Sequence, residues 1–200
     1  MNIKQHLDNK NEIMNINQHL DSNNWFNYAD FYDYVASHKQ FKNLVEVGVW
    51  KGHSMSYLAK KIKESARDVN LYAVDLFSES PDFENNIPAQ SELPIIYELY
   101  NKNLERAGVR DMIKDIKGWS WEVADKFDND SLDFVFLDAS HDAGSVTKDI
   151  NAWLPKVKPG GLFSGHDSMM EGIQTALEKT NLIDRVKYFH TSKQVWYMWV

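Results

Sequence analysis

The chain alternates between short apolar segments and helical segments over most of its length. Strand character is found at residues 44–47, 71–75, 112–116, 132–138 and 162–165. Between and after these segments, the spacing of apolar residues predicts helices over residues 54–63, 94–107, 121–127, 145–154 and 170–179. Strands and helices in this order form right-handed βαβ units. We therefore expect an α/β protein, doubly wound around a mainly parallel sheet.

The end of the chain departs from this alternation. Residues 184–190 and 194–200 are both rich in β-forming side chains, and a short polar connection joins them. They predict a C-terminal antiparallel hairpin, which brings the sheet to seven strands. Because an exposed apolar edge promotes aggregation, the run VWYMWV at 195–200 is expected inside the sheet or at a subunit interface.

Two features precede the first predicted strand. The sequence MNIKQHLD at residues 1–8 recurs as MNINQHLD at 14–21, a duplication at a spacing of 13 residues. Two copies are too few for a repeat fold. Residues 1–23 are therefore predicted to be a polar appendage, and residues 24–200 a single domain. Within that domain, aromatic residues spaced by three and four from position 25 to 35 predict a core-facing helix, which could also cover a substrate cleft.

Composition narrows the classes of function and partner. The net charge is −7 and the charged residues include no basic block, which argues against nucleic acid as a partner. Cysteine is absent, so disulfides, thiolate metal ligands and a thiol nucleophile are excluded. The N-terminus is too polar for a signal peptide, and no apolar run approaches the ~20 residues that cross a bilayer. We expect a cytoplasmic protein without a membrane partner.

The first predicted strand leads into a turn that contains two glycines, in the sequence LVEVGVWKGHS at residues 44–54. A strand, a turn and a helix N-terminus in this order bring bare backbone up to a ligand. Gly48 and Gly52 match the outer glycines of a dinucleotide-binding turn, but Trp50 replaces the middle one. The turn therefore favours S-adenosylmethionine (SAM) over a dinucleotide. Both glycines could also serve a tight turn alone.

Polar residues follow the next two predicted strands. Ligands of parallel sheets bind beyond the carboxyl ends of the strands. Asp75 ends the second strand, where a carboxylate can accept hydrogen bonds from ribose hydroxyls. Ser120 and Trp121 follow the third strand and offer a hydroxyl and a flat indole for adenine. Asp75 could instead cap the segment that follows it, and the indole could simply pack in the core.

A second polar group is expected after the fourth and fifth predicted strands. Asp138 ends the apolar run FVFL, where an unpaired carboxylate is unfavourable, so it needs a cation, a metal or a hydrogen-bonded ligand. His166 and Asp167 end the neighbouring strand, although such a pair is also common on surfaces. Together these three side chains suit Mg²⁺ or Mn²⁺. His141, three residues beyond Asp138, could then take a proton from a metal-bound hydroxyl.

With these motifs the chain resembles class I SAM-dependent methyltransferases. More narrowly, it is similar to the small metal-dependent O-methyltransferases grouped with macrocin-type and cephalosporin-hydroxylase-like proteins. The resemblance covers about residues 41–200 and rests on VEVGVWKGHS at 45–54, LDFVFLDASH at 132–141 and LPKVKPGGLF at 154–163. It implies a seven-stranded, Rossmann-like fold in which a Pro-Gly-Gly turn precedes the fifth strand.

The resemblance also implies roles for individual residues. The implied cofactor-binding residues are Glu46, Gly48, Trp50, Gly52, Ser54, Asp75, Ser120, Trp121 and Asp138. The implied metal ligands are Asp138, His166 and Asp167, and the implied catalytic base is His141. Catechol-type enzymes differ at two of these places, because they carry Asp-Asn after the fifth strand and a lysine as base.

These observations predict a SAM-dependent methyltransferase that acts on a small-molecule hydroxyl with the help of a divalent metal. Two alternatives stay open: an NAD-dependent oxidoreductase, which would need a glycine in place of Trp50, and a SAM-fold binding protein without turnover. Residues 78–93 predict an irregular lid at the ligand end of the sheet. The aromatic helix and the apolar C-terminal strand are also compatible with a homodimer.

Overall fold

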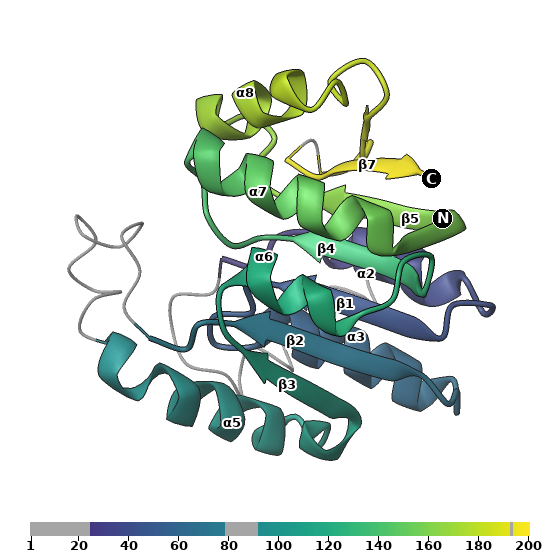
Figure 1. Cartoon of the computed structure of the whole chain (residues 1–200). Helices are drawn as coiled ribbons and strands as arrows, with labels where there is room; N and C mark the ends of the chain where they lie inside the picture. Colours follow the sequence, from purple (N-terminus) through teal and green to yellow (C-terminus); the bar gives the residue numbers. More distant parts are fainter. Residues whose placement is uncertain (1–24, 79–91, 193) are drawn as a thin grey trace.

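The computed structural model of the chain describes residues 25–78, 92–192 and 194–200 (Figure 1). The predicted N-terminal appendage and its duplication lie outside these ranges, as does nearly all of the lid predicted at 78–93. In the described part of the chain, no helix combines the length and the apolar character that crossing a membrane requires.

The described strands form one seven-stranded sheet in the order β3-β2-β1-β4-β5-β7-β6. Their bounds are Asn43–Val47 (β1), Asn70–Asp75 (β2), Ile113–Lys117 (β3), Leu132–Leu137 (β4), Val157–Gly165 (β5), Lys187–Tyr188 (β6) and Trp196–Trp199 (β7). The first five strands are parallel, whereas β7 runs antiparallel to both β5 and β6. The predicted α/β fold with a C-terminal antiparallel pair is therefore confirmed.

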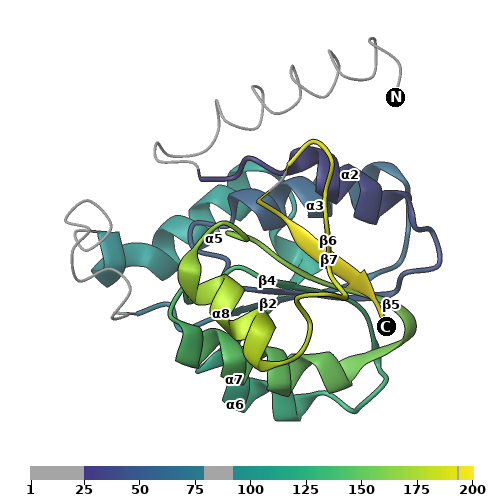
Figure 2. The ribbon, with the colours of Figure 1, turned by 90° about the horizontal axis from the view of Figure 1, so that it is seen from above.

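Helices cover both faces of the sheet, as the view from above shows (Figure 2). One face carries α2 (Ala29–Ser37), α3 (His53–Glu64) and α5 (Ile96–Arg106), and the other carries α6 (Ser120–Val123), α7 (Ala143–Trp153) and α8 (Glu171–Lys179). Short 3₁₀ turns at Leu93–Ile95, Arg110–Met112, Ala124–Lys126 and Leu154–Lys156 adjoin these elements.

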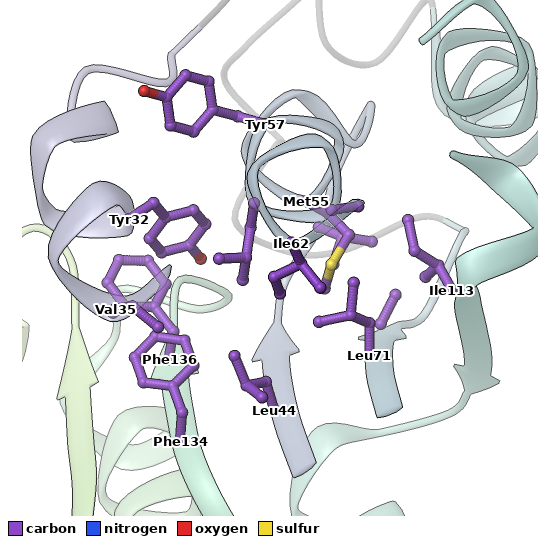
Figure 3. Packing of buried hydrophobic residues seen from close by; sticks show 14 of the residues in the cluster. Tyr32, Val35, Leu44, Met55, Tyr57, Ile62, Leu71, Ile113, Phe134 and Phe136 are labelled. Atoms are coloured by element: carbon purple, nitrogen blue, oxygen red, sulfur yellow. The ribbon is translucent and has the colours of Figure 1, made fainter. Parts of the chain in front are cut away.

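Each face has its own hydrophobic core because successive residues of a strand point to opposite sides. In β1, Leu44 joins the core under α2 and α3, while Val45 and Val47 join the core under α7. The first core is rich in aromatic rings from α2 and β4 (Figure 3). All six residues of β4 are buried, which explains why this strand reads as a continuous apolar run.

The fifth strand begins earlier than the sequence predicts. Residues 159–161, expected as a turn before the strand, lie inside β5, which starts at Val157. Its pairing with β4 shifts register between Leu132 and Phe134, so the strand accommodates these residues as a bulge. Gly160 donates its N–H to the carbonyl of Val200, and Val200 donates to Gly161. The end of the chain therefore supplies the pairing that keeps this segment extended.

The predicted hairpin is shorter than the sequence implies. Of residues 184–190, only Lys187 and Tyr188 form a strand. The apolar C-terminal strand β7 lies between β5 and β6, inside the sheet, as predicted. Its Trp196 is buried against Phe163, with ring centroids 5.5 Å apart.

A buried carboxylate joins the beginnings of the two central strands. Asp133 of β4 accepts hydrogen bonds from the backbone N–H groups of Lys42 and Asn43, at 2.8 Å each. Its other oxygen lies 2.5 Å from the ammonium of Lys158. Asp133 thus fixes the start of β1 relative to β4, and with it the position of the loop at the opposite end of β1.

Replacing Asp133 by Ala should lower the free energy of unfolding by roughly 2–4 kcal/mol, because two backbone N–H groups lose their acceptor. Urea denaturation followed by tryptophan fluorescence measures this loss. The control is Asp128→Ala, which removes an exposed carboxylate from the loop before β4 and should change stability by about 0.5 kcal/mol or less. Equal losses in the two variants would contradict the role of Asp133.

Candidate cofactor and metal site

The turn after β1 packs directly against the end of β4. Gly48 has φ +84°, and a Cβ atom there would lie 2.2 Å from the carbonyl oxygen of Asp138. Its N–H donates to the carbonyl of Val74 in β2, at 2.8 Å. Only a residue without a side chain fits this position, so the glycine predicted from the motif is required by packing as well as by conformation.

The carboxylate of Asp75 holds the same turn in place. One oxygen accepts from the N–H groups of Val49 and Trp50, at 2.9 and 3.0 Å, and the other accepts from Phe77 at 2.8 Å. Burial raises the pKa of Asp75, and these backbone hydrogen bonds act in the opposite direction. The residue predicted to bind ribose therefore fixes the backbone of the turn after β1.

A cavity of about 360 Å³ lies beyond the carboxyl ends of β1, β2 and β4. The predicted cofactor residues that line it are Gly48, Trp50, Asp75, Ser120, Trp121 and Asp138. The predicted cofactor residues outside its lining are Glu46, Gly52 and Ser54. The residues predicted at the carboxyl ends of the strands therefore line the cavity. Three residues in and around the glycine turn, Glu46, Gly52 and Ser54, instead pack around it.

The residues outside the lining have identifiable structural neighbours. The hydroxyl of Ser54, in the first turn of α3, donates to Glu46, which is almost fully buried. Burial raises the pKa of Glu46 to about 8, although the hydroxyls of Ser54 and Tyr32 lower it. Gly52 precedes α3 and faces the ring of Tyr100 on α5, where a Cβ atom would come within 2.9 Å.

One end of the cavity combines indole rings with a buried acid. Trp119 and Trp121 stack with their ring centroids 5.0 Å apart, and the ammonium of Lys148 lies 4.5 Å from the centroid of a Trp121 ring. The hydroxyl of Ser120 donates to Asp149, which is 3% exposed and also lines the cavity. Burial raises the pKa of Asp149 to about 8.

Asp149 was not among the residues predicted from the sequence. It lies within α7, on the face that buries Val146, Ile150 and Trp153. The sequence does contain a signal for Asp149, because it places an acidic residue within an apolar stripe of the helix. Unpaired acids are rarely buried, so such a position indicates a partner or a ligand. The rule that ligand-binding residues follow strands does not cover Asp149, because this residue lies within a helix.

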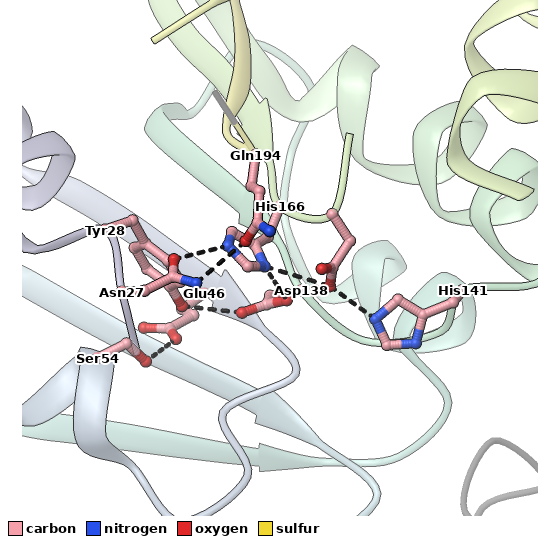
Figure 4. Close-up of polar contacts among 9 residues, drawn as sticks. Asn27, Tyr28, Glu46, Ser54, Asp138, His141, His166 and Gln194 are labelled. Atoms are coloured by element: carbon pink, nitrogen blue, oxygen red, sulfur yellow. Dashed lines mark hydrogen bonds and ion pairs between the residues drawn. The ribbon is translucent and has the colours of Figure 1, made fainter. Parts of the chain in front are cut away.

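A second polar cluster gathers around Asp138, with His141 on one side of it and His166 and Tyr28 nearby (Figure 4). Ligand atoms of Asp138, His141 and Asp167 lie within 4.8 Å of one another. His141 Nε2 is 2.8 Å from Asp167 Oδ2, and Tyr28 donates its hydroxyl to Asp138 Oδ2 at 2.8 Å. Side chains that follow β4 and β5 therefore lie close together, as the parallel sheet predicts.

The histidine in this group of possible metal ligands is His141. The sequence predicts His166 as the ligand instead, so the structure differs from the prediction at this residue. His166 Nε2 lies 3.1 Å from the side-chain oxygen of Asn27, and its ring centroid is 4.7 Å from that of Tyr28. Its Nδ1 is 3.2 Å from Asp167 and 3.6 Å from Asp138. His166 thus packs against both carboxylates and bridges them to Asn27 and Tyr28.

The charges of this cluster are mutually dependent. Burial raises the pKa of Asp138, while His166 and the Tyr28 hydroxyl act to lower it. Burial acts in the same direction on Asp167, but hydrogen bonds from His141 and His166 hold its pKa below the usual range. Burial lowers the pKa of His166, yet its two carboxylate neighbours raise it overall.

The sequence did not identify the residues that contact this cluster from the two ends of the described chain. Tyr28, Asn27 and Gln194 come from opposite ends of the described chain, and the Asn27 amide donates to Gln194 at 3.0 Å. Tyr28 belongs to the aromatic stripe that was expected to face the core or cover a cleft. It does the first with its ring, which is 4.9 Å from that of Phe136, while its hydroxyl contacts Asp138.

Gly48→Ala should destabilise the turn after β1 much more than Gly160→Ala destabilises β5. The two glycines have nearly the same φ, +84° and +79°, but nothing lies within 4 Å of a Cβ atom at Gly160. The control should lose about 1 kcal/mol from backbone strain, and Gly48→Ala roughly 3 kcal/mol or more because of the added clash. Thermal or urea denaturation compares them, and equal losses would argue against the clash.

Asp149→Asn should stabilise the protein in a pH-dependent way. Between about pH 4 and 8 the unfolded chain has Asp149 ionised, whereas the folded chain keeps it protonated, so the wild type loses stability as the pH rises. The variant lacks this loss, so the stability difference in its favour should grow by about 1.4 kcal/mol per pH unit between pH 4 and pH 8. Urea denaturation at several pH values tests this, with the exposed Asp125→Asn as control. A gap that does not widen with pH would refute it.

Comparisons with known proteins agree with this geometry. Residues 45–168 match a family model described as a methyltransferase domain. No curated protein sequence matches the chain significantly. The O-methyltransferase NovP superposes with a TM-score of 0.67 at 18% identity, over 94% of this chain and 78% of that one.

Two further solved structures show how widely this fold is used. The O-methyltransferase TomG from Streptomyces achromogenes, solved in complex with SAM, has a TM-score of 0.60 at 14% identity, over 86% of this chain and 79% of its own. A precorrin 8w decarboxylase from Methanobacterium thermoautotrophicum also reaches 0.60, at 18% identity, over 90% and 94%. Since the family model spans more than half of the sequence, the chain belongs to the methyltransferase-domain family and has the fold of class I SAM-dependent methyltransferases.

Proposed function

We propose that the chain transfers the methyl group of SAM to a hydroxyl oxygen of a small molecule, and that a divalent Mg²⁺ or Mn²⁺ holds that hydroxyl. The observation that carries the proposal is the double position of Asp138. This carboxylate lines the cavity and also belongs to the group of possible metal ligands. A methyl donor in the cavity and a hydroxyl on the metal would therefore be neighbours.

The cavity fits SAM on three grounds. Bare backbone faces it at Gly48, a carboxylate faces it at Asp75, and flat indoles line the end formed by residues 118–121. When bound, SAM supplies an electrophilic methyl group on a positively charged sulfur. Trp50, which takes the place of the middle glycine of a dinucleotide turn, also lines the cavity, and this disfavours the NAD-dependent alternative.

The carboxylate–imidazole cluster fits a hard divalent cation. Asp138 and Asp167 offer oxygen ligands and His141 a nitrogen, which leaves positions for water or a substrate hydroxyl. Such a cation lowers the pKa of a hydroxyl bound to it. Tyr28 and His166 would keep the two carboxylates oriented, through the contacts at 2.8 and 3.2 Å.

The position of His141 bears on how the acceptor loses its proton. As a metal ligand, His141 would be occupied and the proton would leave to solvent. As a base, paired with Asp167, it would take the proton from the acceptor hydroxyl itself. We favour the first assignment because its ring nitrogen lies within the ligand cluster. The assignment of His141 as the catalytic base stays a prediction from the sequence. The experiment below distinguishes it from the assignment as a metal ligand.

An oxygen acceptor is supported by the solved structures of similar fold, since NovP and TomG are described as O-methyltransferases. A small-molecule acceptor is favoured over nucleic acid by the net charge of −7. The homodimer and the cytoplasmic location remain predictions from the sequence.

Calorimetry with S-adenosylhomocysteine and electron paramagnetic resonance with Mn²⁺ test the two halves of the proposal. The wild type should bind both. Asp138→Ala and His141→Ala should each weaken Mn²⁺ binding by about tenfold or more, since each removes one of few ligands. The matched controls, Asp128→Ala and His190→Ala, change exposed residues away from the cluster and should bind Mn²⁺ normally.

The outcomes separate the alternatives. A wild type that binds S-adenosylhomocysteine but no Mn²⁺ would remove the metal from the proposal. Binding of NADH in place of S-adenosylhomocysteine would overturn the methyltransferase chemistry. If His141→Ala keeps Mn²⁺ but loses turnover in a methyl-transfer assay, His141 is the base. Binding of both ligands without any turnover would favour a binding protein.

A further inference from the structure

The carboxyl group of Asp149 has no part in the site as proposed so far. It is 3% exposed, lies on α7 and lines the cavity beside the indole of Trp121. Ser120 donates its hydroxyl to Oδ1, which leaves Oδ2 and further acceptor capacity on Oδ1. A buried acid is unfavourable unless something compensates it, so its place in the wall of a ligand cavity calls for an explanation.

Its neighbours define what kind of ligand group it could meet. Trp119 and Trp121 stack on each other, and the ammonium of Lys148 lies over a Trp121 ring. Trp119, which is 41% exposed, offers a flat apolar surface in the wall of the cavity. Gly118 and Ser145 add further lining without charge. A planar heterocycle that packs against Trp119 would lie in the same cavity as the carboxyl group, which the next residue in the chain, Ser120, already contacts. Adenine is the planar part of SAM, and its edge carries an amino donor next to a ring-nitrogen acceptor.

We propose that the Asp149 carboxyl group recognises the adenine amino group of the cofactor, so that α7 supplies the group that selects adenine. This inference rests on the proposed use of SAM. Oδ1 accepts from the Ser120 hydroxyl and from the adenine amino group. Oδ2, when it carries a proton, donates to the ring nitrogen beside that amino group. Asp149 is thus a specificity residue that touches the cofactor without taking part in methyl transfer.

The protonation state of Asp149 fits this pairing. Burial raises its pKa to about 8, so the acid is neutral at pH 7 and presents one acceptor and one donor. The charged groups that face it are Asp142, which caps the N-terminus of α7, and Lys148 on α7; the former raises the pKa and the latter lowers it. From α6, which packs against α7, the facing groups are the Ser120 hydroxyl and the Trp121 indole, and neither titrates in this range.

The test compares S-adenosylhomocysteine with its 6-deamino analogue, which has purine in place of adenine. Calorimetry on the wild type should show roughly tenfold weaker binding of the analogue, because a buried acceptor loses its donor. Asp149→Leu should bind S-adenosylhomocysteine about tenfold more weakly and should no longer distinguish the two ligands. Asp149→Asn, whose amide also offers one acceptor and one donor, should behave like the wild type at pH 7.

A pH series adds a readout that a purely structural role would not change. As the pH rises from 7 to 9.5, Asp149 ionises and loses its donor, so the wild type should weaken relative to Asp149→Asn by about threefold to tenfold. The ratio of the two proteins cancels the titration of Glu46 and of the ligand's own amino group. A melting curve of each variant shows that it is folded.

Each outcome decides the inference. If Asp149→Leu is folded and still prefers S-adenosylhomocysteine about tenfold, the amino group is recognised elsewhere and the inference is wrong. A wild type that binds both ligands equally would also overturn it. If the wild type binds neither ligand, the proposed use of SAM fails, and that result is distinct from a loss of discrimination between the two ligands.

Discussion

The close contact between Gly48 and the backbone of Asp138 is the constraint on which the rest of the site depends. It joins the turn after β1 to the end of β4, at a separation that excludes any side chain on Gly48. The turn can approach so closely because Asp133 fixes the other ends of the same two strands and Asp75 gathers the backbone N–H groups of the turn. Three short-range interactions thus place the cavity and the carboxylate cluster beside each other.

Asp138 lies where the cavity meets the carboxylate cluster, and its carboxyl group is buried there. Burial opposes ionisation of this carboxyl group. The Tyr28 hydroxyl, which donates to one oxygen, and the His166 imidazole, which lies near the other, favour ionisation. Asp149 and Glu46 are two further buried acids whose pKa values burial raises to about 8. A fold selected for stability alone would replace such groups by apolar ones. Asp138 and Asp149 line the cavity, where a ligand would supply further partners, whereas Glu46 lies outside the lining and accepts from the Ser54 hydroxyl.

Much of the fold could be predicted from the sequence because apolar periodicity and strand order obey local rules. The alternation of segments predicts the parallel sheet, and the carboxyl-end rule correctly gathers Gly48, Asp75, Ser120 and Asp138 around one cavity. The bulge at residues 159–161 could not be predicted, because it depends on pairing with the last residues of the chain. Propensity alone makes Pro-Gly-Gly a turn.

The roles of neighbouring side chains could be predicted less well than the location of the site. Asp167 has φ +53°, an unusual conformation for a residue other than glycine, so the directions of His166 and Asp167 cannot be inferred from a regular strand. The histidine that shares the group of possible metal ligands with Asp138 and Asp167 is His141, from the loop after β4, whereas His166 contacts both carboxylates outside that group. Asp149 escaped notice for a different reason, since it belongs to a helix rather than to a strand end.

The hydrogen bond between Asn27 and Gln194 joins residues 167 positions apart in the chain. A contact between residues so far apart in the sequence closes a very long loop, and this closure has an entropic cost. Such contacts form late in folding, after most of the chain has folded. The indole end of the cavity, built within residues 118–149, closes through far shorter loops. The two ends of one site therefore differ in how they assemble. The end around Asp138 and His166 should therefore order later during folding than the indole end.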